Sequence, residues 1–245
     1  MLSTGKVSAR RIGNCRGKIF RVENSTLQQI INQLYDDEAE AYEAEPGHGI
    51  DNSERECWHA DISAALRLKP NSQVLDVGSG TGIFSRLFAD WGHAVTGLEP
   101  SQNMLRVAHA TTLRQASADR VRFVMGDTHH ADLFEEATYD CIVSRQVVCH
   151  FRDPLLVFQN WHRWLKHQGT ILVVDGLWLR EGWGNDELVD QLPLSCLQTR
   201  ATLAYLLDKA GFHIDANRWL ATVNEHLATT GGSNSPRYLV VAHKF

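Results

Sequence analysis

A short glycine-rich stretch, and an acidic residue that follows it at a set distance, form the strongest chemical signal in this sequence. Gly78, Gly80 and Gly82 come directly after the apolar run 74–77, and glycine lets a chain turn tightly and approach a ligand closely. Glu99 ends the next apolar run, 99 − 78 = 21 residues after Gly78. An acid in that place can accept hydrogen bonds from both hydroxyls of a ribose. The order of strand, glycine turn, helix, strand and acid therefore predicts a site for a ribose-containing ligand.

The spacing of the glycines bears on which ribose ligand is bound. A dinucleotide fingerprint reads GxGxxG, whereas this turn reads GxGxG and has Ile83 at the fingerprint's third glycine position. A nicotinamide-dependent oxidoreductase stays open as an alternative, because Tyr205 and Lys209 have the YxxxK spacing of short-chain dehydrogenases. The TGxxxGxG loop of that group is missing, and the stretch around this pair also has the pattern of an ordinary amphipathic helix.

The motifs around the glycine turn resemble those of the class I methyltransferases. VLDVGSGTG at 74–82, GLEPS at 97–101 and the Gly126-Asp127 pair look like the family's first three motifs. The segment 139–176 is similar to the rest of the family's core, although His167-Gln168-Gly169 replaces its usual Pro-Gly-Gly turn. The resemblance covers about residues 35–176, and points to small-molecule enzymes like those of ubiquinone and menaquinone biosynthesis. It implies S-adenosyl-L-methionine as the cofactor and methyl transfer to a small-molecule acceptor as the reaction.

The same resemblance implies which residues hold the cofactor. The glycine turn would surround its methionine part, Glu99 would hold the ribose, and Asp127 would accept a hydrogen bond from the adenine amino group. The backbone of Arg145 and Gln146 would lie beside the sulfonium. The full set is Tyr35, Tyr42, Asp76, Gly78, Ser79, Gly80, Gly82, Glu99, Pro100, Ser101, Met104, Gly126, Asp127, Thr128, Ser144, Arg145 and Gln146.

Several of these residues also have a purely structural interpretation. Asp127 could cap a following helix, because Asp is a favoured N-cap residue. Met104 could fill the core without touching a ligand. Tyr35 and Tyr42 resemble the family's cap tyrosines, which lie over the cofactor, but packing of one helix face explains their spacing equally well.

Catalysis requires a base only if the acceptor must lose a proton. His150 follows the fourth apolar strand and is the candidate base, or else a histidine that orders its loop. His48, in a Pro-Gly-His-Gly turn, could close over the acceptor or be a plain loop residue. Trp178 and Trp183 lie in the segment 177–199, which interrupts the alternation of strands and helices. We expect them to line the acceptor pocket, with ordinary packing as the alternative.

Other kinds of site and partner are disfavoured. The net charge is −5, which has the wrong sign for a protein that grips nucleic acid through its phosphates. The fourth strand ends in Ser144-Arg145-Gln146 rather than in the Asn/Asp-Pro-Pro-aromatic tetrad that marks methylation of exocyclic amines in adenine. No apolar run approaches the roughly 18 residues of a membrane-spanning helix. His129 and His130 are adjacent and would face apart on a helix, so we expect no metal site.

The elements that position these residues follow from the hydrophobic pattern. Short apolar runs alternate with amphipathic stretches, at 74–77, 94–98, 121–125, 141–144, 171–174 and 238–241. Such alternation predicts a mostly parallel sheet with helices on both faces. Together with the resemblance, it indicates a Rossmann-like, doubly wound α/β fold with seven strands. Ligands of such sheets bind at the carboxyl ends of the strands.

An N-terminal helical cap is expected before this core, over residues 25–69. Apolar residues from Leu27 to Tyr35 share one helix face, which Tyr42 continues, and Ser53 with Glu56 has the spacing of a capping box for a second helix. Asp153 followed by Pro154 predicts the start of a later helix. We expect residues 1–24 to be a flexible extension and 25–245 to be a single domain, with 177–199 as a substrate-side insertion.

The cysteine pattern indicates a reducing compartment. The chain has five cysteines and no CxxC pair, so the cytoplasm is the predicted location. A non-catalytic, partner-binding protein with a methyltransferase fold stays open beside the enzyme, and the sequence does not indicate the oligomeric state.

Overall fold

Seven strands form one twisted sheet in the computed structural model, which describes residues 24–183, 186–197, 199–231 and 235–245. The expected extension 1–24 lies outside the described residues, except for Asn24. The strands are β1 Gln73–Val77, β2 Ala94–Glu99, β3 Val121–Met125, β4 Tyr139–Arg145, β5 Leu165–Gly176, β6 Phe212–Trp219 and β7 Arg237–Lys244. Their order is β3-β2-β1-β4-β5-β7-β6, with only β7 antiparallel to its neighbours. The predicted α/β, doubly wound, mostly parallel sheet is confirmed.

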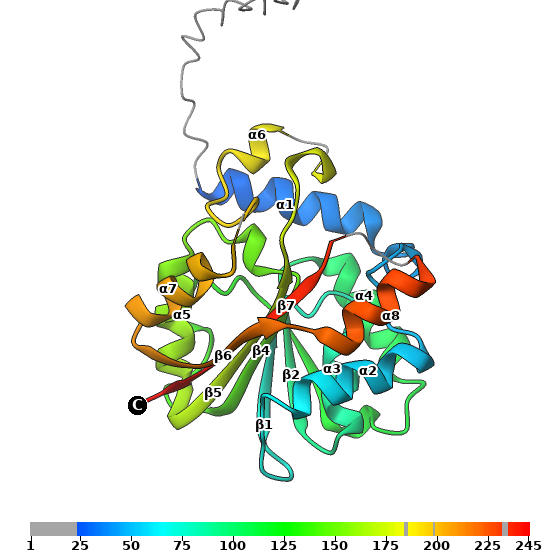
Figure 1. Cartoon of the computed structure of the whole chain (residues 1–245), viewed down its shortest axis with the longest axis vertical. Coiled ribbons are helices and arrows are strands. Elements are labelled where there is room, and N and C mark those ends of the chain that lie inside the picture. The colour runs from blue at the N-terminus through cyan, green and yellow to red at the C-terminus, as the bar shows by residue number, and fades with distance from the viewer. Residues whose placement is uncertain (1–23, 184–185, 198, 232–234) are drawn as a thin grey trace, which may run out of the picture.

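Helices cover both faces of the sheet (Figure 1). The α-helices are α1 Asn24–Glu38, α2 Asn52–Ser63, α3 Ile83–Asp90, α4 Gln102–Thr112, α5 Pro154–Trp164, α6 Asp186–Val189, α7 Ala201–Lys209 and α8 Ala221–Thr230. The 3-10 turns are η1 Tyr42–Ala44, η2 Ala118–Arg120, η3 Ala131–Leu133, η4 Val148–His150 and η5 Arg180–Gly182. Helix α5 begins as predicted, since Asp153 accepts a hydrogen bond from the Leu156 N–H at 3.1 Å.

Two hydrophobic cores lie on opposite faces of the sheet because successive strand side chains alternate between the faces. Trp161 and Phe158 of α5 and Leu207 of α7 pack into one core. Trp58 of α2 and Phe88 of α3 pack into the other, together with α8. Strands buried on both faces are apolar almost throughout, which is why the runs at β1, β4 and β5 could be found in the sequence.

The order of the strands reverses between β1 and β4, where their carboxyl ends leave a crevice. Helix α1 lies across this end of the sheet, and the segment that follows β5 lies above α1 (Figure 1). A separate apolar cluster joins the two, in which Leu27 and Ile31 of α1 pack against Leu188 and Leu192. Helix α1 of the predicted cap and the segment after β5 therefore cover the same end of the sheet, whereas α2, which the prediction also placed in the cap, packs into the core on one face.

Two local expectations need correction, and two elements were missed. The N-cap of α2 is Asp51, whose side chain accepts from the Glu54 N–H at 2.8 Å, so Ser53 and Glu56 do not form a capping box. Helix α1 ends at Glu38, and Tyr42 lies in the separate turn η1 rather than on the same helix. Strand β6 was not located in the sequence because this edge strand alternates exposed polar residues with few apolar ones. Helix α8 was also missed, since its sequence has little amphipathic contrast.

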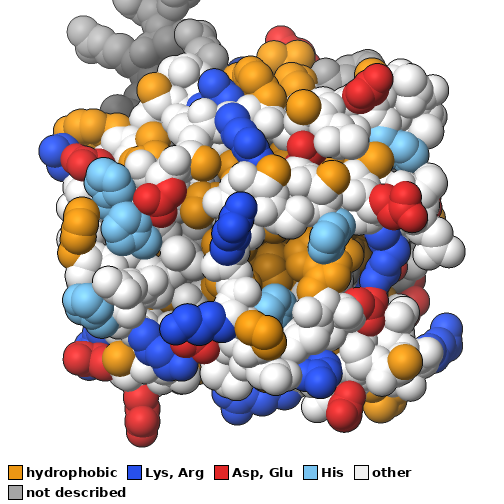
Figure 2. Space-filling model, turned by 60° about the horizontal axis from the view of Figure 1, so that its bottom comes forward, with side chains coloured by type: hydrophobic (Ala, Val, Ile, Leu, Met, Phe, Trp, Pro, Cys, Tyr) orange, Lys and Arg blue, Asp and Glu red, His pale blue; other side chains and the backbone are white. Residues whose placement is uncertain are grey.

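The surface turned toward the lower end of the molecule mixes acidic and basic side chains (Figure 2). Hydrophobic side chains gather there in one central hollow, and histidines lie around it. Among the described residues, no helix is both long and apolar enough to cross a membrane.

Candidate active site

A cavity lies at the carboxyl ends of β1, β2, β3 and β4, beneath α1, with about 620 Å³ of empty space counting the solvent at its mouth. The residues predicted for the cofactor that line it are Tyr35, Gly78, Gly80, Glu99, Pro100, Met104, Gly126, Asp127, Thr128 and Gln146, and the candidate base His150 lines it as well. The strand ends and α1 thus bring together residues that are more than 100 positions apart in the sequence, such as Tyr35 and His150.

The glycine turn forms one wall of the cavity. Gly78 and Gly80 adopt φ angles of +65° and +53°, which side chains disfavour. The N–H groups of Gly78 and Ser79 both donate to the Leu98 carbonyl, at 2.8 and 3.1 Å. A Cβ added at Gly78 would collide with Val147, whereas one added at Gly80 would meet nothing within 4 Å. Gly80 therefore presents bare backbone to the cavity.

Glu99 closes the turn from the end of β2. Its carboxylate accepts from the Gly80 N–H at 3.0 Å and from the Ser101 N–H at 2.9 Å. Burial raises the pKa of Glu99 to about 7, although these two backbone donors oppose the shift. Glu99 lies beside the glycine turn because β1 and β2 are adjacent parallel strands that end at the same edge.

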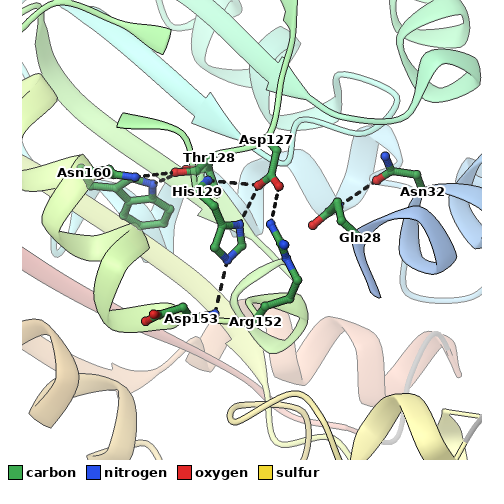
Figure 3. Close-up of polar contacts among 9 residues, drawn as sticks. Gln28, Asn32, Asp127, Thr128, His129, Arg152, Asp153 and Asn160 are labelled. Carbon is green, nitrogen blue, oxygen red and sulfur yellow. Dashed lines mark hydrogen bonds and ion pairs between the residues drawn. The ribbon is translucent and has the colours of Figure 1, made fainter. Parts of the chain in front are cut away.

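Asp127 is held in place by two neighbours (Figure 3). Its Oδ1 accepts from the His129 N–H at 3.0 Å and lies 2.6 Å from His129 Nδ1, and its Oδ2 accepts from Arg152. Burial raises the pKa of Asp127, but the His129 hydrogen bonds and the charge of Arg152 outweigh it and leave that pKa lowered. The carboxylate is therefore ionised and fixed. It caps a two-residue turn rather than the longer helix that was the alternative interpretation.

Arg152 and His129 were not among the predicted site residues. Arg152 comes from the loop after η4, 25 residues beyond Asp127, so only the fold brings them together. Thr128 is fixed from the same side, since its hydroxyl accepts from Trp161 Nε1 at 2.9 Å and its carbonyl accepts from Asn160 Nδ2 at 3.0 Å. These contacts of Arg152, Trp161 and Asn160 could not be predicted from a sequence motif. The only hint was that α5 follows soon after β4 along the chain.

His150 and Tyr35 meet at the other end of the cavity. The Tyr35 hydroxyl lies 2.8 Å from His150 Nε2, and the Cys149 sulfur lies 3.2 Å from Nδ1. The Trp183 ring packs against the imidazole, with ring centroids 4.9 Å apart. Burial lowers the pKa of His150 to about 4 and raises that of Tyr35 well above its ordinary value. Both side chains are therefore neutral at physiological pH.

Five predicted cofactor residues line a second, smaller cavity behind the glycine turn: Tyr42, Asp76, Gly78, Ser79 and Arg145. Gly82, Ser101 and Ser144 line neither cavity. Gly82 caps α3, and Ser101 caps α4 by accepting from the Met104 N–H at 3.1 Å. Ser144 is fully buried in β4.

None of the three predicted acceptor residues lines the main cavity, and Trp183 lies near it only through its contact with the His150 ring. His48 stacks on Tyr42 with ring centroids 4.4 Å apart. Trp178 donates to Asp175 at 2.5 Å and lies under the Arg237 guanidinium. In the part of the chain that the structure describes, no group of three His, Cys, Asp or Glu side chains could hold a metal ion.

Residues 52–217 match a family described as a methyltransferase domain. Phosphoethanolamine N-methyltransferase 3 of Arabidopsis thaliana is 34% identical over 113 residues, which make up 45% of this chain and 22% of that protein. The ubiquinone biosynthesis O-methyltransferase of Pseudomonas syringae is 31% identical over 155 residues, or 62% of each chain. The chain thus spans between a fifth and a third of the plant relatives that it matches.

Two solved structures share the fold. Phosphoethanolamine N-methyltransferase 2 of Haemonchus contortus, in complex with S-adenosyl-L-methionine, superimposes with a TM-score of 0.65 at 21% identity, covering 89% of this chain and 60% of that one. The [4+2]-cyclase SpnF superimposes with a TM-score of 0.67 at 18% identity, covering 88% and 95%. The family match covers more than half of the 245 residues, which confirms the expected class: the chain belongs to the methyltransferase-domain family.

Proposed function

We propose that this protein transfers a methyl group from S-adenosyl-L-methionine to a small-molecule acceptor. The observation that carries this proposal is that one cavity joins the glycine turn, Glu99 and Asp127 to the Tyr35–His150 pair. The first three features suit a nucleoside, and the pair suits a second reactant. A site of this kind aligns two reactants rather than performing covalent chemistry of its own.

The residues present fit the cofactor. Gly80 leaves open space where any other residue would place a Cβ, so a ligand can approach its backbone closely. Glu99 offers two accepting oxygens to a ribose, and Asp127 offers a fixed anion to an amino group, 28 residues further along the chain. Met104, which is almost completely buried, adds an apolar contact beside them. When bound, S-adenosyl-L-methionine supplies an electrophilic methyl group on a positively charged sulfur.

His150 and Tyr35 face the place where the acceptor must lie. A neutral imidazole can accept a proton from an acceptor that has to lose one, and Tyr35 supplies a hydroxyl that fixes the ring at 2.8 Å. Burial lowers the pKa of His150 to about 4, so the ring is neutral and can accept a hydrogen bond throughout the neutral range, although it is a weak base there. We assign His150 the role of base or hydrogen-bond acceptor and Tyr35 that of its positioning partner.

The acceptor is a small molecule with a nitrogen or oxygen nucleophile. The relatives differ on this point, since one group is named for N-methylation of phosphoethanolamine and another for O-methylation in ubiquinone biosynthesis. Trp183, from the described part of the insertion, packs against the His150 ring. A reducing cytoplasm stays the predicted location, supported by the free thiols of Cys57, Cys141, Cys149 and Cys196.

The two alternatives make different predictions. The fold alone does not establish methyl transfer, because a structure named as a [4+2]-cyclase shares it. An oxidoreductase would have needed Tyr205 near the cavity, but Tyr205 lies on the exposed side of α7. A protein that only binds a partner would have no use for a neutral His150–Tyr35 pair beside the ligand.

Thermal unfolding with separate ligands tests the proposal first. A ligand at 100 times its dissociation constant stabilises a protein by about 2.7 kcal/mol, so S-adenosyl-L-homocysteine should raise the unfolding temperature by several degrees. A response to NADH alone would refute methyl transfer. An acceptor screen with radiolabelled cofactor should then include phosphoethanolamine and dihydroxyphenols. With the acceptor found, His150→Gln is expected to lower kcat by about 10² or more, and Tyr35→Phe by a smaller factor.

A further inference from the structure

An open hollow lies at the amino ends of β1 and β2, at the end of the sheet opposite the main cavity. It has about 930 Å³ of empty space, counting the solvent at its mouth. Its walls come from the end of α2, the segment 66–70, and the end of α3 with the turn that follows it. This end of the sheet is turned toward the viewer in Figure 2, where apolar side chains gather in a hollow with histidines around it. None of the residues that form these walls has a part in the site described above.

Aromatic rings form one wall of the hollow. The Phe88 and Trp91 rings have centroids 4.9 Å apart and are tilted by 60° to each other. The His59 ring meets Trp91 edge-on, with centroids 5.1 Å apart. Ile62 and Leu66 add apolar side chains that are only 2% and 6% exposed. Rings that pack against one another hold a fixed surface, and such a surface suits a flat ring system because aromatic rings prefer offset-stacked or edge-to-face contacts.

His93 brings an unused polar group to this apolar surface. It is 8% exposed, and its Nδ1 is buried without a hydrogen-bond partner in the described structure. Burial and the charge of Arg120 lower the pKa of His93, so the ring is neutral at physiological pH and has one N–H to donate. An unpaired polar group in a buried position is unfavourable. A ligand that brings an accepting oxygen into the hollow would satisfy it.

The charge of the hollow is positive. Arg67 lines it, is exposed, and makes no hydrogen bond or ion pair with any described residue. Two neighbouring arginines are already paired, Arg55 with Asp90 and Arg120 with Asn71. Of the described residues that line the hollow, none is Asp or Glu, although the whole chain has 29 acidic and 24 basic residues. The unpaired guanidinium therefore favours a ligand of negative charge.

We propose that this hollow binds a small aromatic carboxylate, whose ring system packs against Phe88 and Trp91 and whose charge is matched by Arg67. His93 supplies a hydrogen bond to the same ligand. The inference does not depend on methyl transfer, and it places a second ligand at the far end of the sheet from the main cavity. Residues 1–23 do not suit the hollow, because they include six basic residues and one acidic residue, and Arg67 would repel them.

A water-filled depression without a ligand is the competing explanation. The two explanations differ in whether the hollow recognises both a ring system and a negative charge. 2-Naphthoate and its neutral amide, 2-naphthamide, have nearly the same shape and differ in charge. A preference for the carboxylate would show that the cation acts on the ligand. A loss of both ligands on removal of Trp91 would show that the rings pack there.

Displacement of the fluorescent anion 1-anilinonaphthalene-8-sulfonate from the full chain measures both affinities, with S-adenosyl-L-homocysteine present to fill the main cavity. We expect the naphthoate to bind about threefold or more tightly than the amide. Arg67→Gln should abolish this preference, and Trp91→Ala should weaken both ligands by about tenfold. Arg114→Gln is the matched control, because Arg114 is also exposed but lines a different depression, beside α4. It should change neither affinity.

No binding of either naphthalene, equal affinities for the two in the wild type, or unchanged affinities in Trp91→Ala would overturn the assignment. If Trp91→Ala does not fold, Ser63→Trp decides, because Ser63 is exposed and lines the hollow, so a large side chain there fills it. Unchanged binding by Ser63→Trp would overturn the site. Failure of S-adenosyl-L-homocysteine to bind would refute the proposed function alone, and the Arg67 and Trp91 variants would still decide the hollow.

Discussion

Two glycines of the same turn, only two residues apart, are expected to fail in different ways when each is replaced by alanine. Gly78 and Gly80 both have positive φ, at +65° and +53°. The added methyl group at Gly78 would lie 2.5 Å from Val147 Cγ2, whereas at Gly80 it would meet no atom within 4 Å. The first substitution therefore strains the protein, and the second fills the cavity that we assign to the ligand.

The magnitudes follow from these contacts. A left-handed conformation costs a non-glycine residue about 1–2 kcal/mol, and this applies to both variants. Overpacking adds roughly 1–3 kcal/mol for Gly78→Ala only. The free energy of unfolding should therefore fall by about 2–5 kcal/mol for Gly78→Ala and by about 1–2 kcal/mol for Gly80→Ala. Natural domains have only about 5–15 kcal/mol in total, so the difference is measurable.

Urea unfolding and calorimetric titration with S-adenosyl-L-homocysteine give the two readouts. Gly80→Ala should keep most of its stability and lose binding by about tenfold or more, because its methyl group projects into the cavity. Gly78→Ala/Val147→Ala removes the colliding side chain and should recover part of the stability lost by Gly78→Ala, as a positive coupling in the double-mutant cycle. Wild-type binding by Gly80→Ala would refute the placement of the ligand. Equal stability of the two single variants would refute the packing argument.

Three further outcomes follow from the charges of the site. The pKa of Glu99 is raised by burial from 4.5 to about 7, so the folded chain holds the proton more tightly and stability falls as pH rises through this range. Glu99→Gln should remove that slope in urea unfolding at pH 5 and pH 8, and an unchanged slope would contradict the assignment. The pKa of His150 is lowered by burial from 6.5 to about 4, so protonation favours the unfolded chain and stability is lost as pH falls below 6.5; the same measurement on His150→Gln should show a smaller loss. Arg152→Met removes the cation that holds Asp127 Oδ2 and should weaken binding of S-adenosyl-L-homocysteine by about tenfold on calorimetric titration. Arg152→Lys should bind more nearly like the wild type. Equal affinities in all three proteins would show that Asp127 does not depend on Arg152.

The core of the fold was predictable because its signals are local. Strands β1, β4 and β5 are buried on both faces and appear in the sequence as apolar runs. The positive φ at Gly78 favours glycine, so the turn can also be recognised from the sequence. Strand β6 lies at the edge of the sheet and needs few apolar residues. Its pattern FHIDANRW therefore does not distinguish it from a loop.

The wall that we assign to the nucleoside was also predictable, since its residues lie at or just after strand ends. Glu99 ends β2 and Asp127 follows the adjacent parallel strand β3 by two residues, so register brings them to the same edge. Their partners were not predictable. Arg152 reaches Asp127 from a loop on the far side of β4, and the Arg145 side chain turns away from the main cavity to lie between Trp58 and Phe84. The orientations of the Arg152 and Arg145 side chains are set by packing between segments that are distant in the sequence.

The acceptor end depends on contacts of another kind. Tyr35 meets His150 across 115 positions of sequence, and Trp183 reaches the same ring from the insertion after β5. These residues belong to the cap and the insertion, which are joined to each other by their own apolar cluster rather than by the sheet. A change in either segment can therefore alter the acceptor pocket without disturbing the glycine turn or Glu99. Because relatives named for different acceptors match this one chain, and because separate segments build this end of the cavity, the acceptor must be found by assay rather than by likeness of fold.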